Sequence, residues 1–104
     1  MVENRVPLSQ AGIVRTGANP SKADFSRAMG VNLQRLRLER GLSQEKLAHM
    51  AGISSYTYQK FEKGESKPGT PMNPRLFTLL SLAEVLDVAL EDIVPADWPD
   101  LSGD

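Results

Sequence analysis

The stretch Leu42-Ser-Gln-Glu-Lys-Leu-Ala-His-Met-Ala-Gly-Ile-Ser-Ser-Tyr-Thr-Tyr-Gln-Lys-Phe-Glu-Lys-Gly64 decides how this chain folds. Its pattern predicts two short helices, one over residues 44–51 and one over residues 55–63. Ser43 and Ser54 stand directly before these helices. Serine is a good N-cap, because its hydroxyl accepts a hydrogen bond from a backbone N–H that has no partner inside the helix.

Small residues fit the tight turn between the two helices. Gly52 closes the first helix, since glycine reaches the left-handed conformation without a Cβ penalty. Ile53 follows as an apolar residue that should point inward, and Ala48 gives the first helix a small residue facing the second. Gly64 ends the second helix. Two short helices joined by a glycine-containing turn make a helix-turn-helix.

The order and spacing of these residues resemble the helix-turn-helix of the phage Cro/cI repressors, also called the XRE family. The matching residues are Arg37, Gly41-Leu42-Ser43-Gln44-Glu45, Leu47-Ala48, Ala51-Gly52-Ile53-Ser54, Tyr58, Phe61-Glu62 and Gly64. The resemblance covers about residues 31–94. It implies an all-α, compact five-helix, lambda-repressor-like domain. It also implies sequence-specific binding of double-stranded DNA by a prokaryotic or phage transcriptional regulator that acts as a homodimer.

The resemblance assigns base contacts to the second helix, which enters the major groove in the family. The positions that match are Ser55, Tyr56 and Lys60. Serine can donate to or accept from several bases, lysine can reach guanine O6 or N7, and tyrosine can pack on a thymine methyl group or bond a phosphate. The alternative is that Tyr56 and Lys60 are merely exposed.

Other residues are expected at the DNA phosphates. Gln44 matches a family position where a side-chain amide and a helix N-terminus hold a phosphate. Residues 65–74 contain three prolines and a glycine, which exclude a regular helix and predict a loop. In the family that the chain resembles, the phage repressors have a shorter connection at this place. The further phosphate contacts, from the second helix through this loop, are Thr57, Lys63, Lys67 and Arg75. The alternative is that Thr57 is a plain surface or half-buried residue.

Arg37 and Glu62 are interpreted as structural rather than DNA-facing. In the family that this chain resembles, an arginine at this place pairs with the glutamate near the end of the helix that corresponds to residues 55–63. Arginine suits the role because its planar guanidinium can hold a carboxylate through two hydrogen bonds.

A first helix is predicted from about Ser26 to Arg40, upstream of the helix-turn-helix. Ser21 or Asp24 could cap an earlier start. Gly30 weakens the middle of this helix, because glycine is a poor helix former, so its ordered part is expected to begin near Val31.

A fourth helix is predicted to begin with Asn73 as its cap and Pro74 at its first position, and to run to about Leu86. Its apolar face is broad, and Phe77 widens it further. Such a face indicates either a second buried surface or a deeply buried central helix. A short fifth helix is expected over residues 90–94. The dimer surface is expected on the fifth helix, on exposed parts of the fourth, and on Trp98.

Three regions are expected: a flexible N-terminal arm over 1–25, the helix-turn-helix domain over 26–95, and a C-terminal tail over 96–104. The arm is either a disordered terminus or a segment that reaches DNA through Arg5 or Arg15. Charge is divided between the halves of the chain. Residues 26–69 carry eight Lys or Arg and four Glu, whereas 70–104 carry one Arg and seven Asp or Glu. The basic part would face the phosphate backbone.

Several classes of function find no support in the sequence. The chain has 104 residues, no cysteine and a single histidine, so no disulfide, metal site or cofactor is expected. No apolar run approaches a membrane span, and a cytoplasmic location is expected. An enzyme is not expected, because no catalytic pair, triad or phosphate loop can be identified. The alternative to a regulator is an antitoxin-like module that binds a partner protein as well as its operator.

Overall fold

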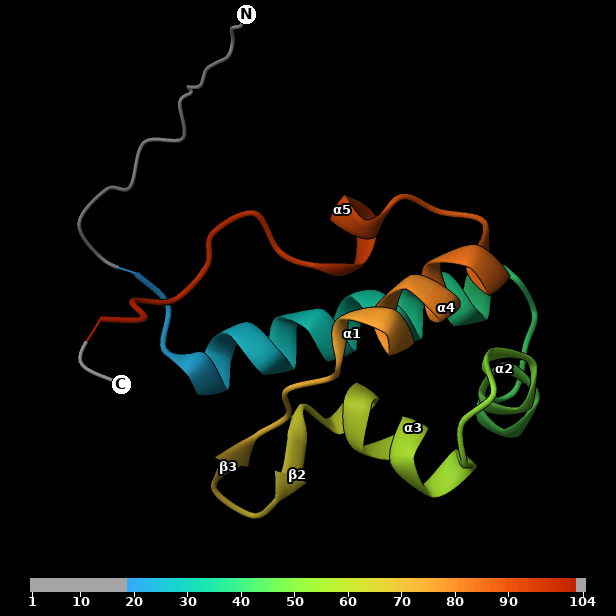
Figure 1. Ribbon diagram of the computed structural model, residues 1–104, viewed down its shortest axis with the longest axis horizontal. Coiled ribbons are helices and arrows are strands. Elements are labelled where there is room, and N and C mark those ends of the chain that lie inside the picture. Colours follow the sequence, from blue (N-terminus) through green and yellow to red (C-terminus); the bar gives the residue numbers. More distant parts are fainter. Residues whose placement is uncertain (1–18, 103–104) are drawn as a thin grey trace, which may run out of the picture.

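The computed structural model describes residues 19–102 as five helices and one small hairpin (Figure 1). In chain order these are α1 (Lys22–Glu39), α2 (Gln44–Ala51), α3 (Ser55–Lys63), β2 (Glu65–Lys67), β3 (Thr70–Pro71), α4 (Leu76–Leu86) and α5 (Leu90–Ile93). The predicted five-helix fold is confirmed. Most of the predicted arm, with Arg5 and Arg15, lies outside the described residues. Within the described part of the chain, no helix is long and apolar enough to cross a membrane.

The ends of α2 and α3 lie where the sequence predicts them. The hydroxyl of Ser43 accepts a hydrogen bond of 3.0 Å from the N–H of Lys46. Ser54 accepts one of 3.1 Å from Thr57 in the same way. Gly52 closes α2 with a φ of 78°. Local capping chemistry therefore sets both helices.

Helix α1 begins four residues before the predicted start at Ser26. Ser21 caps it and accepts a hydrogen bond from Asp24, which confirms the alternative of an earlier start. The expectation that the ordered part of this helix begins near Val31 is wrong, because α1 continues through Gly30 from Lys22. Gly30 is buried where α1 crosses the end of α3, and a Cβ there would lie 2.4 Å from the carbonyl oxygen of Glu62. Glycine is needed because the two backbones approach so closely.

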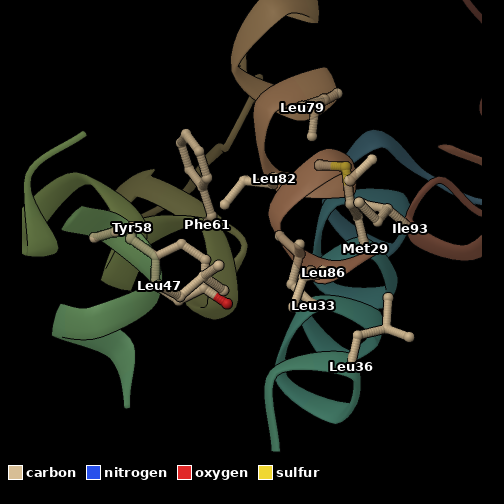
Figure 2. Close-up of a cluster of buried hydrophobic side chains, with 12 residues drawn as sticks. Met29, Leu33, Leu36, Leu47, Tyr58, Phe61, Leu79, Leu82, Leu86 and Ile93 are labelled. Atoms are coloured by element: carbon tan, nitrogen blue, oxygen red, sulfur yellow. The ribbon is translucent and has the colours of Figure 1, made fainter. Parts of the chain in front are cut away.

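The core is a single cluster to which all five helices contribute (Figure 2). Its buried members are Met29, Leu33, Leu36, Leu47, Ala48, Tyr58, Phe61, Leu79, Leu82, Ala83, Leu86 and Ile93. Full burial of one leucine side chain such as Leu33 stabilises the fold by about 1.5–3 kcal/mol. The rings of Tyr58 and Phe61 meet edge to face with centroids 6.3 Å apart. Both side chains are buried in the core, so they determine which face of α3 turns inward.

The segment after α3 is a hairpin rather than a plain loop. Strands β2 and β3 pair antiparallel, with Glu65 opposite Pro71 and Lys67 opposite Thr70. Gly69 has a φ of 82° and makes the turn between the two strands. The prolines exclude a helix here, as the sequence predicts, but they leave enough backbone groups for this short ladder.

The predicted start of α4 is wrong. Asn73 and Pro74 do not form its first turn, because the helix begins at Leu76 and Arg75 occupies the extended cap position. The preceding backbone is held by tertiary contacts. The N–H of Met72 donates to the carbonyl of Gly64 at 2.8 Å, and the carbonyl of Met72 accepts from the hydroxyl of Ser26 at 2.8 Å. These bonds hold the segment just before Pro74, and the chain stays extended until Arg75.

The C-terminal tail returns to the beginning of α1 (Figure 1). Pro99 is buried there, while about half of the Trp98 surface stays exposed. Together with Phe25, Met72 and Leu101, Trp98 lines an apolar groove of about 480 Å³. The groove lies between α1, the segment before α4 and the tail.

Candidate nucleic-acid interface

Helix α3 presents a polar face to solvent because its apolar face is buried. Tyr58 and Phe61 point into the core, so Tyr56, Gln59 and Lys63 turn outward. Tyr56 has 68% of its surface exposed. Lys60 is half-buried beside it, and Ser55 is half-buried in the first turn.

Tyr56 and Lys60 lie against each other on this face. The ammonium nitrogen of Lys60 is 4.3 Å from the centre of the Tyr56 ring. One helical turn separates the two residues, which brings their side chains together, and the ring attracts the cation. The two side chains form one unit that presents an aromatic ring and a positive charge.

Thr57 takes part in the start of α3. Its Oγ1 accepts a hydrogen bond of 2.9 Å from the hydroxyl of Ser54, while its N–H donates to the same Ser54 oxygen. The hydroxyl hydrogen of Thr57 is still a donor. Thr57 is half-buried, so this hydroxyl lies at the edge of the polar face.

A concave basic surface, here called the basic trough, lies between α3 and the hairpin. Its volume is about 290 Å³. It is lined by Tyr56, Gln59, Lys60, Lys63, Glu65, Ser66, Lys67 and Pro68. Four of the residues predicted from the sequence are thus brought together. Ser66 was missed, because the second wall of the trough exists only once residues 65–71 pair as strands. Gln59 lies on α3 itself and was missed because the family resemblance assigns base contacts only to Ser55, Tyr56 and Lys60.

Two predicted phosphate contacts lie apart from the trough lining. Arg75 is exposed at the cap position of α4. Gln44 is half-buried, and its side-chain nitrogen donates to Oε1 of Glu62 at 2.9 Å. Its amide is therefore bound to the structural ion pair behind the interface, which leaves one further N–H as a donor.

The structure places Arg37 and Glu62 together as a buried ion pair. Nε of Arg37 donates to Oε2 of Glu62 at 2.6 Å, and Nη2 donates to Oε1 at 3.2 Å. Only 10% of the Arg37 side chain and 6% of the Glu62 side chain are exposed. The hydroxyl of Tyr58 donates to Oε2 at 2.5 Å. With Gln44, the carboxylate accepts four hydrogen bonds and joins α1, α2 and α3.

These contacts shift the acid–base properties of the cluster. Burial alone would raise the pKa of Glu62, but hydrogen bonds from Arg37, Tyr58 and Gln44 outweigh it and hold that pKa below its ordinary value. Burial and the bond to Glu62 raise the pKa of Tyr58 far above its ordinary range. The hydrogen bond to Glu62 raises the pKa of Arg37. Tyr58 therefore stays a donor and the pair stays charged at neutral pH.

The described residues offer no sign of metal chemistry. Between residues 19 and 102, no group of three His, Asp or Glu side chains is placed to hold a metal ion.

Comparisons with known proteins bear on the family and the fold of this chain. Residues 33–93 match the helix-turn-helix family model. The chain is 35% identical over 75 residues to the uncharacterized HTH-type transcriptional regulator y4dJ of Sinorhizobium fredii, a match that covers 71% of this chain and 90% of that protein.

Two solved structures give the same result. The restriction-modification controller protein C.AhdI from Aeromonas hydrophila is 31% identical with a TM-score of 0.57, covering 64% of this chain and 92% of that one. SinR, the master regulator for biofilm formation from Bacillus subtilis, is solved in complex with DNA and is 27% identical with a TM-score of 0.53, covering 61% of this chain and 92% of that one. SinR is also solved in complex with SinI.

Proposed function

The chain belongs to the helix-turn-helix family of Cro/cI (XRE) type, and from that premise we propose that it binds double-stranded DNA in a sequence-specific manner with α3 in the major groove. The observation that supports this most is the basic trough, which has the Tyr56–Lys60 pair on its α3 wall. Bound at an operator, the protein would regulate transcription by blocking or recruiting other proteins. Such a role places it in the cytoplasm.

Alanine substitutions should distinguish residues that contact bases from residues that contact phosphates. We expect Tyr56→Ala or Lys60→Ala to change the preferred bases at one or two positions, each costing about 1–3 kcal/mol of discrimination. Lys63→Ala should instead weaken binding to all sequences alike and reduce the slope of log K against log salt by about 0.9. Selection from random duplexes, followed by a salt titration, measures both effects. An unchanged consensus in Lys60→Ala would contradict the assignment of this residue to bases.

We propose that the protein acts as a symmetric dimer in which the exposed part of α4 meets a second copy. Leu76, Phe77 and Leu80 lie on neighbouring positions of this helix, and Phe77 is 79% exposed. An exposed patch of three neighbouring large apolar side chains favours association. A closed dimer would place two copies of α3 about one DNA turn apart, or roughly 34 Å.

Phe77→Lys should convert the dimer to a monomer without loss of fold. A buried charge would weaken the contact, while the exposed position leaves the core untouched. Sedimentation equilibrium measures the mass, and circular dichroism checks the helices. Leu38→Lys is the matched control, because Leu38 is 60% exposed on α1. If Phe77→Lys left the mass of a dimeric wild type unchanged, the α4 interface would be wrong.

The second candidate function is an antitoxin-like module that binds a partner protein. The apolar groove beside Trp98 favours it, since an apolar surface with a half-exposed tryptophan suits contact with a partner protein. This function and operator binding are compatible. Trp98→Ala should leave operator affinity unchanged while it weakens binding of a purified partner. If Trp98→Ala weakened operator binding as much as partner binding, a separate partner site would be contradicted.

A further inference from the structure

The basic trough has two walls made by different elements. Tyr56 and Lys60 lie on the α3 wall, whereas Ser66, Lys67 and Pro68 lie on the hairpin wall. Figure 1 shows α3 and the hairpin together on one side of α1. A ligand that fills the trough must therefore lie between the recognition helix and the hairpin.

The hairpin is held firmly against the end of α3. Gly64 ends α3 and leads directly into β2, with a φ of 82°. The N–H of Met72, just after β3, donates to the carbonyl of Gly64 at 2.8 Å. Both ends of the hairpin are thus joined at one residue. A wall fixed in this way is preorganised for binding.

The shape of DNA then determines what the hairpin contacts. The ridge that separates the major groove from the minor groove is a sugar-phosphate backbone, and three lysines line the trough to hold one: Lys60, Lys63 and Lys67. We propose that one backbone strand lies in the trough, so that the hairpin tip over residues 67–69 reaches the minor groove beside the half-site. This inference rests on the proposed placement of α3 in the major groove.

The tip has the chemistry that such a position requires. Pro68 and Gly69 are small, both are exposed, and the minor groove is only about 6 Å wide. Glu65 is the one carboxylate of the trough, and its Oε2 accepts from the N–H of Gly69 at 3.4 Å, within the hairpin turn. Lys67 would contact the phosphates from the minor-groove side. Because narrow A·T tracts concentrate negative potential there, Lys67 should favour A·T pairs.

Modified flanking base pairs test this directly. The selected half-site is placed in duplexes whose flanking pairs, on each side in turn, are A·T, G·C or inosine·C. Inosine lacks the minor-groove amino group of guanine but keeps its major-groove edge. Wild-type protein should bind the A·T and inosine·C duplexes about fivefold more tightly than G·C on one side, the lower end of the effect of one base pair.

Three variants assign the effect to the hairpin tip. Lys67→Ala should remove the flanking preference, and Lys67→Arg, which keeps the charge, should retain it. Arg35→Ala removes a positive charge from the exposed face of α1 and should also retain it. The inference would be overturned if wild type bound the duplexes with A·T, G·C and inosine·C flanking pairs equally well, or if the preference persisted in Lys67→Ala. Either result would leave α3 in the major groove. Failure to bind any duplex would overturn the proposed function as well.

Discussion

Arg37→Ala should lower the free energy of unfolding by about 3–5 kcal/mol, because it leaves the carboxylate of Glu62 buried and without its cation. Arg37 supplies two of the four hydrogen bonds that Glu62 accepts, and its Nη1 also donates to the carbonyl of Leu42 at 2.9 Å. One substitution therefore loosens the contacts between α1, the turn before α2 and α3. Chemical denaturation followed by circular dichroism measures the loss.

Arg35→Ala is the matched control for this substitution. Arg35 lies on the same helix but is half exposed, and its 3.6 Å ion pair with Glu39 is a surface contact. It should change stability by less than about 1 kcal/mol. Arg37→Lys should fall between the two, because lysine keeps the charge but cannot form the two-pronged contact. Equal stability of Arg37→Ala and Arg35→Ala would contradict a structural role for the pair.

The same cluster predicts how stability depends on pH. The pKa of Glu62 is lower in the folded protein than the ordinary value of 4.5, so the unfolded chain binds its proton first as the pH falls. The contribution of Glu62 is therefore complete well above pH 4.5 and is lost as the pH falls through its folded pKa. Glu62→Gln cannot titrate. The stability advantage of wild type over this variant should shrink on acidification, and a constant difference would contradict the lowered pKa.

Gly64→Ala should destabilise the protein by about 2–5 kcal/mol, because two costs add at this residue. Its φ of 82° strains any residue with a Cβ, and that Cβ would lie 2.8 Å from the Cα of Arg27 in α1. Gly69 separates the two costs, since it has the same φ of 82° but nothing within 4 Å of a Cβ. Gly69→Ala should cost only about 1–2 kcal/mol for strain.

Gly30→Ala tests the close contact without the backbone strain, because no positive φ is found at Gly30. Gly30 lies inside α1, where alanine normally favours a helix by about 1 kcal/mol, yet its Cβ would meet the backbone of Phe61 and Glu62. We expect a net loss of stability in thermal or chemical denaturation. If Gly30→Ala and Gly64→Ala were as stable as Gly69→Ala, close contact between α1 and the end of α3 would not be required for the fold.

Local signals explain why α2 and α3 could be predicted from the sequence. Ser43, Gly52 and Ser54 cap these helices through hydrogen bonds and backbone angles within a few residues, so their effect does not depend on the rest of the fold. Family resemblance pointed to Arg37 and Glu62 because the motif holds them in a fixed register. What it did not indicate was that Tyr58 and Gln44 also donate to this carboxylate.

The wrong predictions share a physical cause, which is contact between distant segments. Gly30 was interpreted by its helix propensity, but the end of α3 determines its role. Asn73 and Pro74 carry good signals for a helix start, but Met72 is tied to Gly64 and Ser26, which delays the start to Leu76. The hairpin wall of the trough depends on the same hydrogen bond between Met72 and Gly64. Sequence patterns do not contain such contacts.

Selection from a random duplex DNA library, repeated across a salt series with the full chain, tests sequence-specific binding most directly. We expect a palindromic consensus, with half-sites about one helical turn apart, and affinity that falls steeply as salt rises. Enrichment should be lost in a Tyr56→Ala/Lys60→Ala double variant at the positions that this pair contacts. Failure of the wild-type protein to enrich any sequence even at low salt would contradict its proposed action as a DNA-binding regulator.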